Sequence, residues 1–279
     1  MWPCTGICHH ARDCEKFQTE CESCFFLKSK GKDLSTSVFD KKMSLYKDAN
    51  ITFVGCSRWL SGRAKKSYLL RGKAVLSIPN PIDTKVYHPM DQGMARELLG
   101  LPSGKRLLLF GALNVTDKRK GIDYLIEALR RMEKQDVELV VFGQVKDDIR
   151  GLFPVPIHSM GYLSDESKIV ALYNAVDMFI TSSLEENLPN TIMESMACGT
   201  PCVGFEIGGI PEMIDHRVNG YVANYKDAGD LANGIQWVLE HEDRLALSDA
   251  CVKKVQENYT EEVVAKQYTA LYEKLLKGE

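Results

Sequence analysis

The chain has 279 residues, of which 44% are hydrophobic and 26% charged, a composition typical of soluble globular proteins with one or two domains. Its apolar runs fall far short of the roughly 18 residues that cross a bilayer, and no signal peptide is recognisable, so we expect a cytoplasmic protein. The net charge of −3 divides into +7 for residues 1–88 and −10 for the remainder, so the basic part could face anionic lipid, a phosphorylated substrate or only water.

Residues 1–35 are irregular and rich in cysteine. Cys8, Cys14, Cys21 and Cys24 are spaced as C-x5-C-x6-C-x2-C, with Cys4 as a substitute. Four thiolates suit a tetrahedral metal site in a reducing compartment, where disulfides are rare. Zinc is the first expectation and an iron–sulfur cluster the second, and reduced or paired thiols are the alternative. A structural metal would help a segment with little core to fold.

The next part of the chain reads as helix 37–47, strand 51–55, helix 57–70 and strand 74–80. The sequence Pro79-Asn80-Pro81 then breaks any regular element and indicates a domain boundary. We therefore assign residues 1–80 to a partial first domain.

Strands alternate with helices beyond the boundary. Buried strands are predicted at 106–112, 137–143, 177–183 and 200–205, with a weaker one at 155–161, and helices at 121–133, 167–175 and 189–198. The last 50 residues are mostly helical, in three segments over 230–241, 243–258 and 261–276. This alternation predicts an α/β fold, a Rossmann-like domain with a parallel sheet covered by helices. Ligands of such a sheet bind at the carboxyl ends of its strands.

Two carboxylates flank one helix start in the stretch SSLEENLPNTIMESMACGTPCVGF. Glu186 lies in the loop after a strand, and Glu194 follows eight residues later inside the helix that begins near Pro189. The free N–H groups there, at Asn190 and Thr191, and the helix dipole favour a diphosphate. A carboxylate one turn into the helix can accept hydrogen bonds from two vicinal hydroxyls of a ribose, and one before the helix can face a sugar. A capping Glu and a surface Glu are the plain alternative.

The E-x7-E spacing, with a strand before it and CGTPCVGF after it, resembles the signature of the retaining family 4 glycosyltransferases, which have the GT-B fold (glycosyl transferases group 1). The resemblance implies that Glu194 holds the ribose of a donor nucleotide and that Glu186 lies at the donor sugar. It spans about residues 51–260 and includes the Gly-Gly of GFEIGGIPEM near the donor sugar. The intervening residues of the donor site would be Asn187, Leu188, Pro189, Asn190 and Thr191.

A second stretch, FGALNVTDKRKGIDYLIEAL, agrees with this resemblance. Gly111 ends a strand and would let a phosphate approach the backbone, and Lys120 could place its ammonium on the diphosphate leaving group. The family often has Arg six residues before the Lys, where this chain has Asn114, so Arg119 is a candidate for the missing charge. A basic helix start on the surface is the alternative.

Other matches are weaker. The loop MGYLSDES resembles the segment that contacts the base, through Tyr162 and Leu163, although Tyr162 could equally be a packing aromatic. The Asp147-Asp148 pair follows a strand but is better interpreted as a solvated turn than as a metal site. In related enzymes a segment resembling HDMWP carries an active-site His, and this chain starts at Met-Trp-Pro, so we expect an N-terminally truncated transferase.

The resemblance implies two Rossmann-like domains, of which residues 1–80 are a remnant of the first, 81–260 the donor-binding domain and 261–279 a helix that crosses back to the first domain. It implies transfer of a sugar, with retention, from a UDP- or GDP-linked donor to a glycan or lipid-linked acceptor in polysaccharide synthesis. We expect no cofactor for the chemistry and no nucleic-acid partner. We do expect peripheral contact with the inner face of the membrane. The alternative is a non-catalytic fragment that binds a nucleotide sugar, or one subunit of a split enzyme. A GT-B epimerase is a third reading, but we find no acid and base residues for it in this sequence.

Overall fold

The computed structural model describes residues 1–114, 117–132, 136–144 and 150–278. The chain forms two compact units, Met1–Pro79 and Asn80–Glu279, and the boundary along the chain falls within the sequence Pro79-Asn80-Pro81. Each unit has its own hydrophobic core and is described by itself.

The first unit combines irregular chain with a short parallel sheet. Its elements in chain order are η1 (Trp2–Cys4), η2 (Lys16–Gln18), α1 (Leu34–Lys47), β1 (Thr52–Gly55), α2 (Arg58–Lys65), η3 (Tyr68–Leu70) and β2 (Ala74–Ser77). Strand β1 pairs in parallel with β2. Helix α1 begins earlier than predicted because the Asp33 carboxylate accepts hydrogen bonds from the N–H groups of Ser35 and Thr36.

The predicted helix 57–70 is interrupted. Helix α2 ends at Lys65, and a separate 3-10 turn, η3, follows. Between them, the buried Ser67 hydroxyl donates to the Cys4 carbonyl at 2.8 Å and accepts from the Leu69 N–H at 3.2 Å. A serine that bonds to nearby backbone competes with helix continuation, so this contact explains the break.

A buried lysine holds the N-terminal segment on α1. Lys42 Nζ donates to the carbonyl oxygens of Trp2 at 2.6 Å, Thr5 at 2.8 Å and Gly6 at 3.0 Å. The ammonium also lies 3.6 Å from the centroid of the Trp2 ring. Three acceptors and an aromatic face compensate the desolvated charge, so a segment without regular structure gains a fixed position.

The second unit is built on a parallel sheet with the strand order β5-β4-β3-β6-β7-β8. Its strands are β3 (Arg106–Asn114), β4 (Val137–Gln144), β5 (Ile157–Gly161), β6 (Met178–Thr181), β7 (Cys202–Phe205) and β8 (Gly220–Ala223). Its helices are α3 (Gln92–Leu99), α4 (Ile122–Arg131), α5 (Glu166–Ala175), α6 (Asn190–Ala197), α7 (Ile210–Met213), α8 (Ala228–Leu239), α9 (Arg244–Asn258) and α10 (Glu261–Leu276), with 3-10 turns η4 (Lys118–Lys120) and η5 (Arg150–Leu152). The predicted α/β class with a parallel sheet is confirmed.

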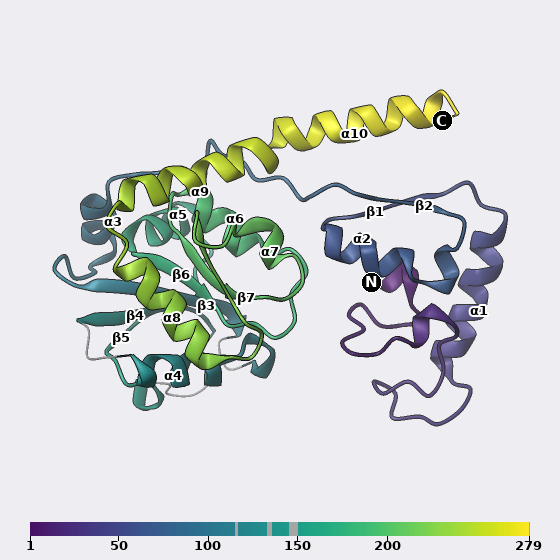
Figure 1. The fold of residues 1–279 in the computed structure, drawn as a ribbon, viewed down its shortest axis with the longest axis horizontal. Helices are drawn as coiled ribbons and strands as arrows, with labels where there is room; N and C mark the ends of the chain where they lie inside the picture. The colour runs from purple at the N-terminus through teal and green to yellow at the C-terminus, as the bar shows by residue number, and fades with distance from the viewer. Residues whose placement is uncertain (115–116, 133–135, 145–149, 279) are drawn as a thin grey trace. The chain divides into compact units, whose positions relative to one another are not determined.

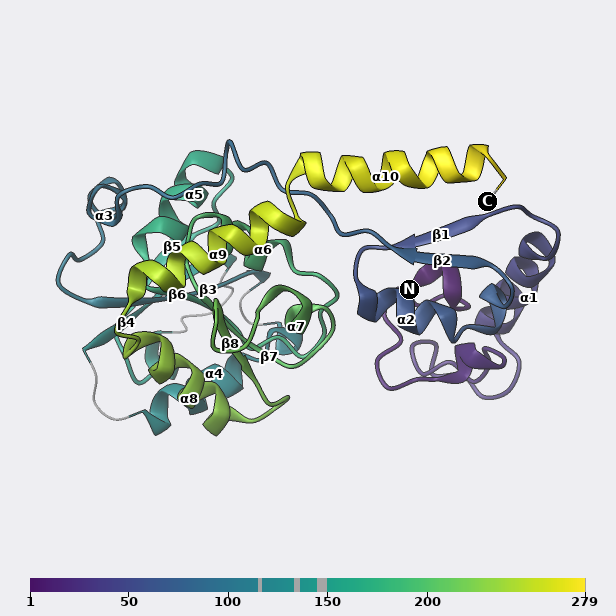
Figure 2. The ribbon, with the colours of Figure 1, turned by 45° about the horizontal axis from the view of Figure 1, so that its top comes forward.

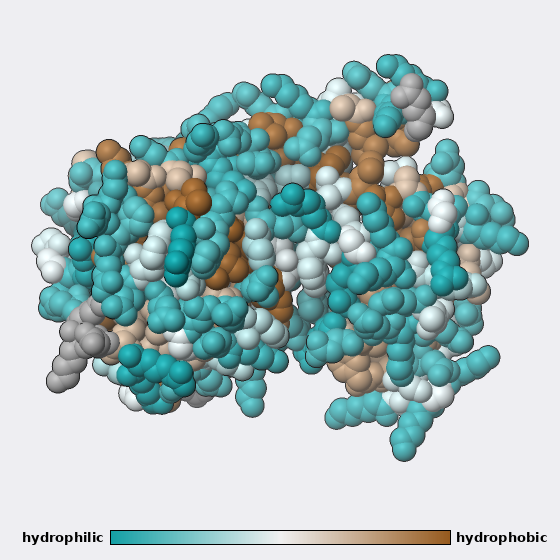
Figure 3. All heavy atoms as spheres, viewed as in Figure 1, coloured by the Kyte–Doolittle hydropathy of each residue, from teal (hydrophilic) through white to brown (hydrophobic). Residues whose placement is uncertain are grey.

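Helices cover both faces of this sheet. Helices α4 and α8 pack side by side on one face, and α5, α6 and α9 lie over the other (Figures 1 and 2). The strand interiors, such as Leu107, Leu108, Leu109 and Phe110, are buried on both faces, as a doubly covered sheet requires. Most of the surface visible in Figure 3 is hydrophilic. Among the described residues, no helix is both long and apolar enough to cross a membrane.

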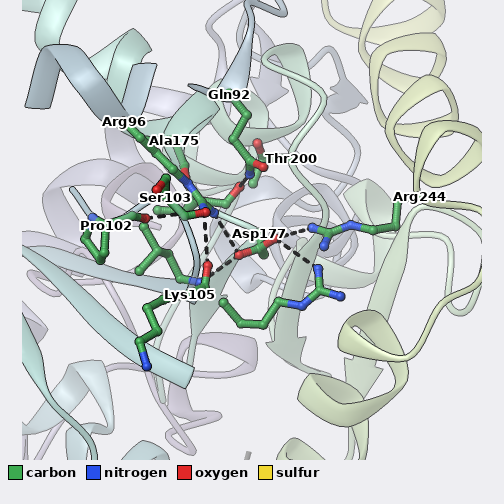
Figure 4. Close-up of polar contacts among 12 residues, drawn as sticks. Gln92, Arg96, Pro102, Ser103, Lys105, Ala175, Asp177, Thr200 and Arg244 are labelled. Carbon is green, nitrogen blue, oxygen red and sulfur yellow. Dashed lines mark hydrogen bonds and ion pairs between the residues drawn. The ribbon is translucent and has the colours of Figure 1, made fainter. Parts of the chain in front are cut away.

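One buried carboxylate joins the amino ends of the strands to the helices (Figure 4). Asp177, which is 3% exposed, pairs with the buried Arg96 at 3.1 Å and accepts from the Leu107 N–H at 2.6 Å. Arg244 of α9 pairs with its other oxygen. Arg96 also donates to the Ala175 carbonyl at 2.7 Å. These contacts tie α3 and α9 to β3 and to the start of β6.

We expect Asp177→Ala to lower the free energy of unfolding by about 3–5 kcal/mol, because it leaves the buried Arg96 charge without a carboxylate partner. The matched control is Asp136→Ala, which removes an exposed ion pair with Lys105 and should have a much smaller effect on stability. Urea denaturation followed by circular dichroism measures both values. Equal, small losses in the two variants would show that the Asp177 cluster does not hold the unit together.

Candidate functional site

The order in which strands are added to the sheet reverses between β3 and β6. Strands β4 and β5 extend the sheet on one side of β3, and β6, β7 and β8 extend it on the other. In open parallel sheets, the crevice outside the carboxyl ends of the strands at such a point binds ligands. The loops that meet there include η4 after β3, residues 182–189 after β6 and residues 206–209 after β7.

Gly121 allows the first two loops to approach each other closely. Gly121 has φ +62°, and a Cβ at this position would lie 2.0 Å from the carbonyl oxygen of Ser182. The Ser182 hydroxyl donates to the Lys120 carbonyl at 3.0 Å, and the Leu184 N–H donates to the Arg119 carbonyl at 2.7 Å. Only glycine combines this backbone conformation with this close approach, so it fixes the position of Lys120.

Lys120 and Glu186, which are 66 residues apart, form an ion pair at this place. Lys120 Nζ lies 2.5 Å from Glu186 Oε1, and the two side chains are 32% and 15% exposed. The loop after β7 supports the carboxylate, because a Cβ on Gly208 would lie 2.1 Å from the Glu186 carbonyl oxygen and the Gly209 N–H donates to Asn187 O at 2.5 Å. The sequence assigned both charged residues to the site but did not predict their pairing.

Helix α6 starts beside this pair without a side-chain cap. Its N-cap residue is the buried Pro189, which has no side chain that could accept a hydrogen bond. Helices α3, α5 and α9 begin instead with a capping aspartate, and α10 with a threonine. The first N–H groups of α6, at Asn190 and Thr191, therefore remain for an acceptor from outside the helix, and the helix dipole favours an anion there.

The second carboxylate of the motif is held by a buried tyrosine. Glu194 Oε2 accepts a hydrogen bond of 2.7 Å from the hydroxyl of Tyr173, which α5 contributes and which is 1% exposed. Burial raises the pKa of Glu194, the Tyr173 hydrogen bond lowers it and the nearby Glu166 raises it. Burial also raises the pKa of Tyr87 to about 12, and the charges of Glu194 and Glu166 add to this effect. Tyr173 was not predicted, since nothing in the sequence indicates a contact across two helices.

Other predicted residues have different surroundings. Arg119 is bound by Asp117, with 2.6 Å between Arg119 Nη2 and Asp117 Oδ2, and this contact lowers the pKa of Asp117. Tyr162 is 61% exposed after β5, and Leu163 beside it is half-buried. Leu188 is buried. The structure thus brings Lys120, Glu186, Asn187, Pro189, Asn190, Thr191 and Glu194 into adjoining loops and one helix, and it does not place Tyr162 in contact with them.

Gly111 has a packing role within the sheet. We expected this glycine to admit a phosphate, but a Cβ on it would lie 1.9 Å from Cε1 of Phe142, its register partner on β4. The aromatic ring fills the space that a side chain would need, so packing within the sheet is sufficient to require a glycine, and the approach of a phosphate stays a prediction. The Asp147-Asp148 pair lies outside the described residues.

Several cysteines of the first unit lie near one another. Cys8, Cys14, Cys21 and Cys24 are free thiols, and charge repulsion from the other three adds to the burial that raises the pKa of Cys21 to about 11. The Gly6 N–H donates to Cys21 Sγ at 3.2 Å. Within the described part of the chain, no three His, Cys, Asp or Glu side chains are arranged to hold a metal ion. This geometry lends no support to the expected zinc or iron–sulfur site, which stays a prediction.

Residues 104–241, which include the site between β3 and β7, match the family model of the glycosyl transferases group 1. The chain belongs to the group 1 glycosyltransferases. Among curated members, it is 24% identical over 213 residues to the N-acetyl-alpha-D-glucosaminyl L-malate synthase of Bacillus anthracis, covering 74% of this chain and 55% of that protein. It is 27% identical over 172 residues to the D-inositol 3-phosphate glycosyltransferase of Mycolicibacterium smegmatis, covering 58% and 39%.

Solved structures show the same fold for this glycosyltransferase chain. Sucrose-phosphate synthase from Thermosynechococcus elongatus superposes with a TM-score of 0.73 at 21% identity, covering 95% of this chain and 66% of that one. Anabaena HepE in complex with UDP and glucose superposes with a TM-score of 0.69 at 18% identity, covering 85% and 67%. The predicted GT-B class is confirmed. The chain spans about half the length of curated relatives such as the B. anthracis synthase.

We expect Tyr173→Phe to raise the pKa of Glu194 further, because it removes the hydrogen bond that favours the carboxylate. The folded-state pKa of Glu194 already lies above the ordinary value of 4.5, so ionising this group costs stability as the pH rises past that value, and the variant enlarges the cost. Titration of the labelled glutamate carboxyl carbons by NMR measures the shift. The control Tyr124→Phe, on α4, should leave Glu194 unchanged. Identical titration of Glu194 in wild type and Tyr173→Phe would contradict the contact.

Proposed function

We propose that the chain binds a nucleoside diphosphate sugar between η4 and α6 and transfers the sugar, with retention, to a hydroxyl of a glycan or lipid-linked acceptor. The observation that supports this proposal is that adjoining loops and one helix contribute Lys120, the uncapped start of α6 and the half-buried Glu194. A cation, free N–H groups and a carboxylate are the groups that a phosphate pair and a ribose require. The UDP and glucose named for HepE support UDP-glucose as a first ligand to test.

Each group would act on one part of the donor. The N–H groups of Asn190 and Thr191 and the Lys120 ammonium bind the diphosphate. The ionised Glu194 accepts hydrogen bonds from both ribose hydroxyls and also from the Tyr173 hydroxyl. During transfer, the bond from the anomeric carbon to the diphosphate oxygen breaks and a bond to the acceptor oxygen forms on the same face. The acceptor proton passes to the departing diphosphate, whose charge Lys120 and the helix dipole stabilise.

Glu186 would have two roles in this reaction, because it pairs with Lys120 before the donor binds. A diphosphate carries more negative charge than one carboxylate, so it would replace Glu186 as the partner of Lys120. Glu186, then released, could accept hydrogen bonds from hydroxyls of the donor sugar, as the family resemblance implies. Donor binding and orientation of the sugar would thus be coupled through one lysine.

Glu194→Ala should weaken the binding of UDP to the 279-residue chain by about 10- to 100-fold, because a charged hydrogen bond contributes about 1.5–3 kcal/mol. Isothermal titration calorimetry of wild type and variant measures the change, and Glu240→Ala at the exposed C-cap of α8 is the control. Nucleotide release with UDP-glucose and lipid-linked acceptors then tests transfer. Binding without any release would favour the alternative of a binding module, and equal UDP affinity in wild type and Glu194→Ala would contradict the ribose assignment.

Glu186→Gln should tighten the binding of UDP by up to about 5-fold, since it releases Lys120 from a partly exposed ion pair worth at most about 1 kcal/mol. The control is Glu185→Gln, which removes the same charge from the neighbouring position of the same loop without removing the partner of Lys120. Calorimetry at low ionic strength compares the three proteins. If both variants changed UDP affinity equally, general electrostatics rather than release of Lys120 would be responsible.

A further inference from the structure

A hollow in the second unit lies away from the candidate donor site. It has a volume of about 470 Å³, within the range that small molecules occupy, and its lining includes Asp177 and Pro201, which directly precede β6 and β7. Since these strands run parallel, the hollow lies at their amino ends and the candidate donor site at their carboxyl ends. The other walls come from the start of α3 and the segment before it, the ends of α5 and α6, and parts of α8 and α9.

Arginine side chains make one wall of the hollow positively charged. The Asp177 carboxylate pairs with the guanidinium groups of Arg96, Arg106 and Arg244, so three positive charges face one negative charge. Among the described residues that line the hollow, Asp177 is the one acidic side chain. An anion that enters the hollow would therefore be attracted to this wall.

Arg244 has hydrogen-bond donors to offer such an anion. Its Nη2 atom reaches Asp177 from the start of α9 (Figure 4), and no described residue accepts a hydrogen bond from its Nε or Nη1. The side chain is 39% exposed. The nearby carboxylates of Asp91 and Asp243 cap the helices that follow them. The free edge of the guanidinium therefore matches a second carboxylate, which it can bind through charge-assisted hydrogen bonds.

The remaining walls favour a ligand with an apolar body. They include Met90, Val176, Val238, Leu245 and Leu247, of which Leu247 is buried and Leu245 is 72% exposed. An inorganic anion would contact the arginine alone, whereas an aliphatic or aromatic carboxylate would also remove apolar surface from water. A single negative charge suits a site that already contains one carboxylate.

The hollow adjoins the part of the chain that holds Glu194. Thr200 lines it, and the buried Thr200 hydroxyl donates to the Tyr173 carbonyl at 2.7 Å. Asn174, also in the lining, accepts from the Met90 N–H at 2.8 Å. The Tyr173 hydroxyl in turn donates to Glu194. A molecule packed against Thr200 and Asn174 would restrict the position of Tyr173 and would preorganise Glu194.

We propose that this hollow binds a small organic monocarboxylate through Arg244, and that the bound molecule strengthens nucleotide binding by fixing the chain around Tyr173. The effect on the nucleotide rests on the proposed function, because it requires Glu194 to bind the ribose. The binding of the carboxylate does not depend on it, so the two parts are measured separately.

The first measurement is titration of the isotope-labelled 279-residue chain with phenylbutyrate and with its neutral amide, phenylbutyramide, followed by NMR. The amide should bind at least about 10-fold more weakly, because it lacks the charge that pairs with Arg244. Leu245→Glu places a negative charge at an exposed position of the lining and should weaken phenylbutyrate binding at least about 5-fold. The matched control is Leu98→Glu, at a 64% exposed position of α3 outside the lining, and it should bind like wild type.

The second measurement is calorimetric titration of UDP with and without saturating phenylbutyrate. UDP should bind about 5-fold more tightly in its presence, and by linkage UDP should strengthen phenylbutyrate binding by the same factor. Leu245→Glu should bind UDP like wild type but should lose this enhancement, and circular dichroism checks that both variants are folded.

The proposal is overturned if the acid and the amide bind equally, if Leu98→Glu loses as much phenylbutyrate binding as Leu245→Glu, or if saturating phenylbutyrate leaves the affinity for UDP unchanged. Failure of wild type to bind UDP at all would instead contradict the proposed function, and with it the effect on the nucleotide. The phenylbutyrate titration would still decide whether the hollow is a carboxylate site.

Discussion

The candidate site depends on the contact between Gly121 and Ser182. The loop after β3 and the loop after β6 approach each other so closely that a Cβ would lie 2.0 Å from a carbonyl oxygen. Two hydrogen bonds, from Ser182 to Lys120 and from Leu184 to Arg119, accompany this approach. This approach places η4 so that Lys120 reaches Glu186 at the β3–β6 crossing.

The rest of the site adds preorganised polar groups to this scaffold. Helix α6 presents its first N–H groups because a proline occupies the N-cap position, and Tyr173 holds Glu194 from the side of α5. Each group carries a cost in the free protein: an uncapped helix start, a desolvated carboxylate and a lysine occupied by a neighbouring glutamate. A nucleoside diphosphate sugar bound as proposed would relieve all three, which is why we propose a binding site here rather than a stable surface.

Sequence patterns were sufficient for the architecture because burial and periodicity are local properties. The alternation of apolar strands with amphipathic helices predicted the parallel sheet, and the spacing of Glu186 and Glu194 selected the loop and helix of the candidate site, which stays a prediction. Helix α3, the short α7 and strand β8 were not predicted, since they are short or lack a distinct period.

Contacts between distant segments could not be predicted in the same way. The Lys120–Glu186 pair joins residues 66 positions apart, and the Tyr173–Glu194 hydrogen bond joins two helices. A glycine in a strand fits either a close ligand or a neighbouring ring, and only the structure shows that the Phe142 ring lies beside Gly111. The cysteine spacing predicted a metal, and the structure gathers the thiols without arranging them as ligands.

The most direct test is a crystal structure of this chain with UDP bound. The account predicts that the diphosphate lies on the N–H groups of Asn190 and Thr191, that Lys120 has left Glu186 for a phosphate oxygen, and that Glu194 accepts hydrogen bonds from the ribose while still bonded to Tyr173. A structure in which UDP binds elsewhere, or in which it binds here with the Lys120–Glu186 pair intact, would contradict the account.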